Sequence, residues 1–180
     1  MSHWKFIPGT EEELYFLTSA VVDWTYIFTE PMYFDIVIEC LKYCQTKKGL
    51  LIAGYVIMPN HIHLICAGMK GQKLSDIMRD FKHYTAHKIL DELKINQREK
   101  EIDVFRKAAL EEGKGNEHKF WIEGLHPVLV SNECMFREKL NYMHDNPVRK
   151  GFVDSPEHWL YSTARNYILG DHSILKVECL

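Results

Sequence analysis

Residues 50–67 read LLIAGYVIMPNHIHLICA, and this stretch predicts the centre of the fold. Two apolar runs rich in β-branched residues, 50–58 and 61–67, are separated by the turn-forming pair Pro59-Asn60. This pattern predicts an antiparallel β-hairpin. We therefore expect a sheet built around these two strands.

The second strand of this hairpin begins with two histidines, His61 and His63. Successive side chains of a strand point to opposite faces, so the two imidazoles are expected on one face, with Ile62 and Leu64 on the other. Neutral imidazole is the commonest side-chain ligand of metals, and the pair could form half of a coordination sphere. Histidines at this spacing also occur in strands without any metal, so the pair alone leaves both interpretations open.

Strand and helix patterns alternate on both sides of the hairpin. A strand is expected at 14–22, helices at 32–47 and from 74 to about 89, and a broken or edge strand at 120–130. Ser131 or Asn132 should cap a helix that runs to about residue 145. This order predicts an α+β, ferredoxin-like fold, in which an antiparallel sheet carries helices on one face and can receive a ligand on the other.

The remaining segments complete a single domain over residues 1–180. The highly charged interval 94–119 has only a weak amphipathic pattern, and we expect a long connection or a short helix there. Ser155-Pro156-Glu157 should open a C-terminal helical extension through residue 167, and residues 174–177 are a candidate last strand.

Composition indicates a compact protein. The chain has 180 residues, of which 46% are hydrophobic, and this excludes a mainly disordered chain. It contains no apolar run near the ~20 residues that span a bilayer and no N-terminal pattern typical of a signal peptide. We therefore expect a cytoplasmic protein with no membrane partner.

The five cysteines are odd in number and have no Cys-X-X-Cys spacing. This argues against a disulfide framework and against a thiolate zinc site, so the thiols are expected to pack as small apolar groups. They are Cys40, Cys44, Cys66, Cys134 and Cys179.

The formal net charge of −3 excludes a bulk polycation, so any nucleic acid must be bound by a local basic patch. Four cations flank the segments with candidate chemistry and could form the rim of such a patch. They are Arg79, Lys82, Arg149 and Lys150. Each of them could equally be a solubilising surface charge.

A tyrosine stands out in the helix expected after residue 132. Phe136, Leu140 and Met143 form its apolar stripe, and at ~100° per residue Tyr142 lies more than a right angle away from that stripe. Tyr142 is therefore free to reach into a site, although a partly buried tyrosine bonded to backbone is the ordinary case. Pro147 disfavours the α conformation at the residue before it, so we expect the last turn of this helix to fray.

At this point several motifs together resemble a known family. Residues 58–64, MPNHIHL, resemble the histidine-hydrophobe-histidine (HUH) motif of the single-tyrosine transposases, and residues 142–151, YMHDNPVRKG, resemble the tyrosine helix of their REP-associated branch. Three further stretches match that branch in the same order, covering most of residues 14–168. They are DFKHYT at 80–85, FW at 120–121 and WLYSTARNY at 159–167.

The resemblance implies a ferredoxin-like fold and a DNA-transposition enzyme that nicks and rejoins single-stranded DNA, expected to contain a hairpin, through a 5′-phosphotyrosine intermediate. By position, Tyr142 matches the nucleophile, His61 and His63 match the metal-binding histidines, and Asn146 matches a third ligand. The implied cofactor is a divalent metal, Mg²⁺ or Mn²⁺. A monomer suffices if Tyr142 reaches its own histidines, whereas a displaced helix would require a homodimer.

Two other functions fit some of the same residues. A catalytically inactive protein that binds single-stranded nucleic acid on the same fold would keep its affinity without metal and without Tyr142. A small metallohydrolase would use the histidine pair to activate water and release products without a covalent intermediate. The tyrosine-helix motif counts against the hydrolase.

Overall fold

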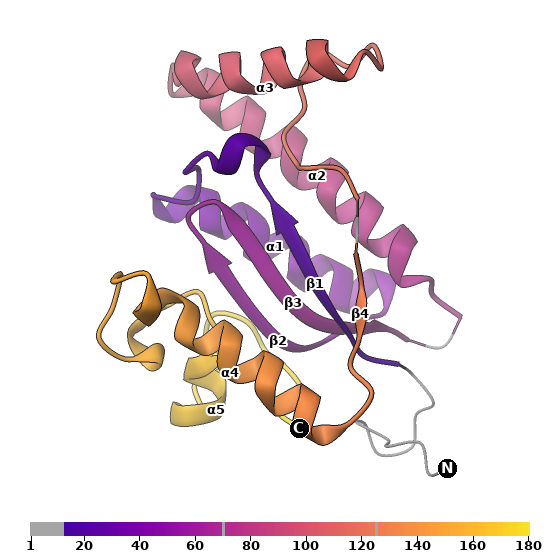
Figure 1. The fold of residues 1–180 in the computed structure, drawn as a ribbon, viewed down its shortest axis with the longest axis vertical. Coiled ribbons are helices and arrows are strands. Elements are labelled where there is room, and N and C mark those ends of the chain that lie inside the picture. Colours follow the sequence, from indigo (N-terminus) through magenta and orange to yellow (C-terminus); the bar gives the residue numbers. More distant parts are fainter. Residues whose placement is uncertain (1–12, 70, 125) are drawn as a thin grey trace.

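A four-stranded antiparallel sheet forms the centre of the molecule in the computed structural model, which describes residues 13–69, 71–124 and 126–180 (Figure 1). The strand order is β2-β3-β1-β4, and the elements follow one another as β1, α1, β2, β3, α2, α3, β4. This is the predicted ferredoxin-like arrangement with one helix, α3, added. The strands are β1 (Tyr15–Ala20), β2 (Leu50–Met58), β3 (His61–Gly68) and β4 (Val128–Leu129).

The hairpin of β2 and β3 forms as expected from the two apolar runs. Both strands are almost completely buried, and β3 pairs with β1 on its other side. The β2–β3 register shifts between Ile52 and Gly54. The edge strand β4 is only two residues long, which agrees with the broken strand predicted there.

Helices lie on both faces of the sheet. Helices α1 and α2 pack on the face that carries Ile62 and Leu64, whereas α4 packs on the opposite face with Ala53 and Val56 (Figure 1). The predicted arrangement with helices on one face therefore holds for α1 and α2, and α4 covers part of the other face because its apolar stripe needs a partner. The helices are α1 (Pro31–Lys48), α2 (Leu74–Ile95), α3 (Glu99–Glu112), α4 (Glu133–Arg149) and α5 (Ala164–Leu169), with short 3-10 helices η1 (Val22–Trp24) and η2 (Pro156–His158).

The charged interval 94–119 contains a full helix of 14 residues rather than a bare connection. Ile102, Phe105 and Ala109 are buried on one side of α3, which contacts α2 and η1. The weak amphipathic pattern therefore did indicate a helix, and it was weak because charged residues occupy the exposed side of α3.

The C-terminal region differs from the prediction. Instead of one helix from Ser155 to residue 167, the chain forms η2 and α5, separated by a segment that pairs with β2: Ile57 N–H donates to the Tyr161 carbonyl, and Thr163 N–H donates to the Tyr55 carbonyl. Residues 174–177 form no strand. Residues 161–163 therefore use their backbone groups to pair with the edge of β2, and this prevents a continuous helix.

The prediction that the cysteines pack as small apolar groups is correct for Cys40, Cys44 and Cys66, which are buried. It is wrong for Cys134, in the first turn of α4, and for Cys179, both of which are exposed. Within the described ranges, no helix is both long and apolar enough to cross a membrane.

Candidate active site at the histidine pair

Strand β3 places His61 and His63 side by side on the sheet face that α4 covers. Their ring centroids are 4.7 Å apart, and both side chains are buried. The β1 residue opposite His63 is Thr18. The alternation of the strand therefore has the predicted result: both histidines share a face.

Side-chain oxygens fix the Nδ1 edge of both rings. The Asn60 amide donates from Nδ2 to the Trp24 carbonyl at 3.1 Å, which turns its Oδ1 toward His61 Nδ1 at 2.7 Å. His61 Nδ1 must then carry the proton, and its Nε2 lone pair is free to act as an acceptor. His63 Nδ1 lies 2.8 Å from the Thr18 hydroxyl. Such outer contacts orient imidazoles that bind metals.

The Nε2 atoms face the space under α4. His63 Nε2 is buried and has no hydrogen-bond partner among the described residues. His61 Nε2 lies 3.3 Å from the amide Nδ2 of Asn146, which is 3% exposed. A half-turn of that amide would present Oδ1 at the same position, so an oxygen and two nitrogens can converge there.

Both imidazoles are uncharged at neutral pH. Burial lowers the pKa of His61 to about 4, with a smaller effect of the Lys150 ammonium. Burial lowers the pKa of His63 to about 3, assisted by His61 and by the Arg149 guanidinium. Neutral rings whose Nε2 atoms face this space are the form that binds a cation.

This donor set fits a divalent metal with open positions. Across the residues that the structure describes, no three His, Cys, Asp or Glu side chains meet to form a metal site. The candidate ligands are instead His61, His63 and the amide of Asn146. Two imidazoles and one oxygen suit Mn²⁺ or another transition ion better than Mg²⁺, and leave positions for water or phosphate.

Helix α4 brings Tyr142 to the same place in the same chain. The Tyr142 ring centroid lies 5.5 Å from that of His63, and the side chain is 42% exposed. The Arg149 guanidinium carbon stands 4.5 Å from the centre of the tyrosine ring. The predicted rotation of Tyr142 away from the buried stripe is confirmed, because Leu140 and Met143 pack into the sheet.

The predicted fraying of α4 is wrong. The helix starts at the Asn132 cap, whose side chain accepts from Met135 N–H at 2.9 Å, and continues through Pro147 to Arg149. Burial of Asn146 against His61 outweighs the local preference imposed by the proline. Asn146 therefore stays one turn after Tyr142.

A glycine lets α4 approach the sheet this closely. A Cβ added to Gly54 would lie 2.6 Å from Met143 Cε and 3.1 Å from Leu140 Cδ1. No larger residue fits there without displacing these side chains. The position of Tyr142 thus depends on the presence of glycine, which has no side chain, at residue 54 of β2.

Of the four predicted rim cations, two lie at the site and two do not. Arg149 and Lys150 end α4 beside the histidines. Arg79 belongs to α2 on the other face of the sheet and is paired with Asp76 and Asp80 at 2.8 and 3.3 Å.

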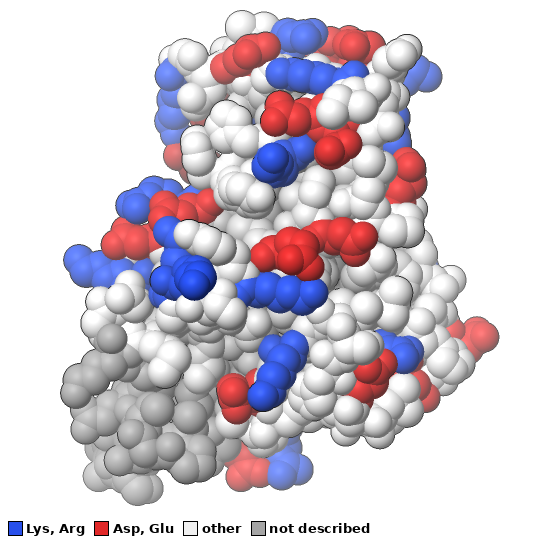
Figure 2. Space-filling view, turned by 180° about the vertical axis from the view of Figure 1, so that it is seen from behind, with Lys and Arg blue, Asp and Glu red and all other residues white. Residues whose placement is uncertain are grey.

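Lys82, also on α2, donates to the carbonyls of Ile122 and Gly124 and holds that segment in place. Figure 2 shows the molecule from behind, where basic and acidic residues are interspersed. We therefore assign Arg79 and Lys82 no part in the candidate site.

Several neighbours escaped the sequence analysis. The Phe16 ring stacks on His63 at 5.2 Å, and the Trp24 ring meets His61 edge-on at 5.5 Å. Thr18 and Phe16 become neighbours of His63 only through the β1–β3 register, which the sequence does not state. Asn60 could have been noticed, because it precedes the histidine motif directly.

Part of the chain matches a known protein family. The family model described as "Transposase IS200 like" matches residues 25–105, which include both histidines but not α4. No curated protein sequence matches the chain.

The solved structures that are similar to this one include the following two. One is described as the REP-associated tyrosine transposase bound to a REP hairpin, with a TM-score of 0.63, 18% identity and complete coverage of both chains. Another, a candidate transposase from Deinococcus radiodurans, has a TM-score of 0.46 and 16% identity over 79% of this chain and 96% of its own. The resemblance seen in the sequence is confirmed in two respects: residues 25–105 match the IS200-like transposase family model, and the chain has the fold of the solved REP-associated tyrosine transposase.

Proposed function

We propose that this protein nicks and rejoins single-stranded DNA in a metal-dependent, transposase-type reaction with Tyr142 as the nucleophile. The observation that carries the proposal is the position of Tyr142, whose ring centroid lies 5.5 Å from that of His63. The buried Nε2 of His63 has no hydrogen-bond partner within residues 13–69, 71–124 and 126–180. The proposed substrate is single-stranded DNA containing a hairpin, since the similar solved structure is described as bound to one.

In the proposed reaction the Tyr142 hydroxyl oxygen forms a bond to phosphorus, and the bond from phosphorus to the 3′ oxygen of the preceding nucleotide breaks. The products are a 5′-phosphotyrosine and a free 3′-hydroxyl, which takes up a proton. Attack by a 3′-hydroxyl reverses the step and rejoins the strand. No external energy source is needed, because the phosphodiester bond is conserved in the intermediate.

The chain's own residues support this step by charge and position. Arg149, whose guanidinium stands over the Tyr142 ring, and Lys150 offer positive charge to the phosphate. A divalent cation, Mg²⁺ or Mn²⁺, held by His61, His63 and Asn146 would supply further charge to the non-bridging oxygens. Thr18 and Asn60 keep the two rings turned toward it.

The central experiment detects the covalent intermediate. Hairpin DNA with single-stranded flanks, labelled at its 3′ end, is incubated with the protein and Mn²⁺, and adducts are separated under denaturing conditions. An adduct is expected that disappears with chelator and in Tyr142→Phe. Tyr43→Phe is the matched control, since Tyr43 is also an exposed tyrosine but lies on α1, and this variant should retain the adduct.

The other functions predict different results. An adduct of unchanged yield in Tyr142→Phe would exclude the proposed nucleophile. Cleavage without an adduct would indicate a hydrolase, and binding that survives both chelator and Tyr142→Phe, with no cleavage, would indicate an inactive binding protein.

We further propose that one chain supplies the whole site, since Tyr142 lies beside the histidines of its own chain. Mixing Tyr142→Phe with a His61→Ala, His63→Ala double variant tests this. Two incomplete sites should remain inactive together. Recovered adduct formation in the mixture would show that the tyrosine acts in a partner subunit, as in a homodimer.

A further inference from the structure

A large aromatic side chain stands exposed at the edge of the candidate site without a role in the proposed chemistry. Trp24 is 53% exposed, and its ring centroid lies 5.5 Å from that of His61 at an angle of 74°. An indole left half in water costs the burial free energy that a core position would give. It stands beside His61, a candidate metal ligand.

The backbone holds this ring in place. Asp23 and Trp24 both adopt positive φ, 53° and 52°, a conformation that side chains other than glycine seldom take. Hydrogen bonds secure both sides of the turn: Trp24 N–H donates to the Val21 carbonyl, and Asn60 Nδ2 donates to the Trp24 carbonyl. Trp24 is thus tied to the same asparagine that orients His61.

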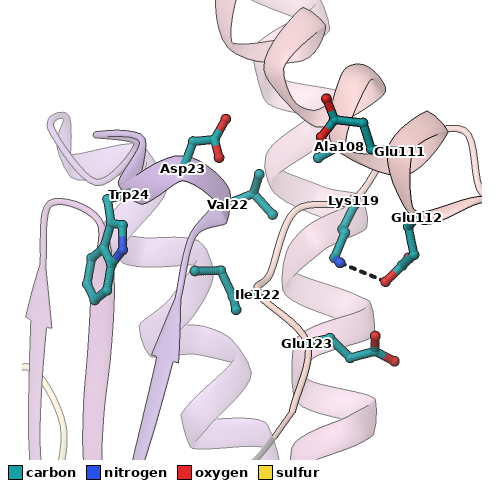
Figure 3. A pocket seen from close by; sticks show the side chains of 9 residues that line it. All are labelled: Val22, Asp23, Trp24, Ala108, Glu111, Glu112, Lys119, Ile122 and Glu123. Carbon is teal, nitrogen blue, oxygen red and sulfur yellow. Dashed lines mark ion pairs between the residues drawn. The ribbon is translucent and has the colours of Figure 1, made fainter.

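The surface beyond Trp24 is unsuited to phosphate. A cavity of about 570 Å³ opens there, between η1 and the end of α3 (Figure 3). Its acidic lining residues are Asp23, Glu111, Glu112 and Glu123, and Val22 and Ile122 add apolar surface.

The nearest lysines are already paired. Lys119 binds Glu112 at 2.7 Å, and Lys114 binds Glu112 and Glu123 at 3.4 and 2.5 Å. Carboxylates repel a phosphate chain but accept hydrogen bonds from the amino groups of bases. The cations that could hold phosphate, Arg149 and Lys150, lie at the histidines instead.

We propose that Trp24 is a stacking platform for one unpaired nucleobase next to the phosphate that Tyr142 attacks. The inference rests on the proposed function and adds to it the course of the strand: phosphates pass Arg149 and Lys150, and one base turns away from them onto the indole. Aromatic side chains bind bases of any sequence in this way, because every base offers a π-face.

Binding of hairpin DNA in the Tyr142→Phe background tests this without interference from cleavage. A fluorescent hairpin with ten-nucleotide single-stranded flanks is used, together with a set in which one flank nucleotide at a time is abasic. Trp24→Ala should weaken binding of the intact hairpin about 5- to 100-fold, and Trp24→Phe by less than about threefold. Tyr43→Ala, which removes an equally exposed ring on the other face of the sheet, should have no effect.

The abasic set identifies the base concerned. One abasic position should weaken binding by the unaltered Trp24 protein as much as Trp24→Ala does, and the two changes together should cause no further loss. The proposal would be overturned if Trp24→Ala weakened binding of the intact hairpin and of every abasic hairpin by the same factor. It would also be overturned if Trp24→Ala left the affinity for the intact hairpin unchanged.

A Mn²⁺ titration separates stacking from an indirect effect through His61. Trp24→Ala should bind Mn²⁺ like the unaltered protein, and a matching loss of Mn²⁺ affinity would overturn the proposal. Failure of the proposed function looks different: no hairpin would then give a covalent adduct with the unaltered chain. If the adduct forms while Trp24→Ala binds DNA as tightly as before, only the stacking inference fails.

Discussion

Replacing Gly54 by alanine should displace the Met143 and Leu140 side chains of α4 and lower the free energy of unfolding. The new methyl carbon would stand 2.6 Å from Met143 Cε and 3.1 Å from Leu140 Cδ1, whereas contacting carbons lie about 3.5–4.0 Å apart. Both side chains are flexible at these atoms but buried, so they must retreat by about 0.4–1.4 Å within a packed core. Overpacking of this kind costs about 1–3 kcal/mol.

The assay is urea unfolding of a double-mutant cycle with Met143→Ala. Met143→Ala alone should cost about 2–5 kcal/mol through the cavity it leaves. In the Gly54→Ala protein the truncation also relieves the clash, so the two changes should couple by about 0.5–3 kcal/mol. A thermal scan of Gly54→Ala should show a Tm about 2–12 °C lower.

Gly68→Ala is the matched control. Its added methyl would meet the backbone oxygen of Gln72, away from α4, so its cost should add to that of Met143→Ala. Additivity of Gly54→Ala with Met143→Ala, within about 0.5 kcal/mol, would refute the close packing of α4 on β2 and with it the placement of Tyr142.

Two further changes test other contacts. Asn60→Ala should weaken Mn²⁺ binding about 10- to 100-fold in calorimetric titration, because the neighbouring imidazole loses the partner that fixes its proton; an unchanged affinity would contradict this role. Hydrogen bonds from Ser173 and Arg165 lower the pKa of Asp171 from 3.8 to about 2. The unfolded chain therefore binds the proton first, so this stabilisation is present above pH 4 and is lost as the pH falls toward 2. Asp171→Asn should show a weaker loss of stability than the unaltered protein over that range, and the exposed-site control Asp154→Asn should behave like the unaltered protein.

The sequence predicted the centre of the fold well where local signals were strong. The apolar runs on either side of Pro59-Asn60 became β2 and β3, and the helical spacing around residues 32–47 became α1. The same alternation placed His61 and His63 on one face, and the helical period turned Tyr142 away from the buried stripe. These features depend on the side-chain periods of 2 residues in a strand and 3.6 residues in a helix, which can be read from the sequence alone.

Features that depend on packing between distant segments were not predictable. The fraying expected at Pro147 is prevented by burial of Asn146 against His61, 85 residues away in the chain. The helix expected from residue 155 is interrupted because Tyr161 and Thr163 bond to β2. Thr18 reaches His63 through strand register alone.

Helix α4 carries the proposed nucleophile, a candidate ligand and Arg149 within two turns, and it rests on β2 through Leu140 and Met143. In the proposed reaction the 5′ end of the cleaved strand would be covalently attached to this helix through Tyr142. Any tilt of α4 would then carry the attached 5′ end, the amide of Asn146 and the guanidinium away together as a rigid body. The packing of Leu140 and Met143 against Gly54 in β2 would thus set how far the attached 5′ end can move before the strand is rejoined.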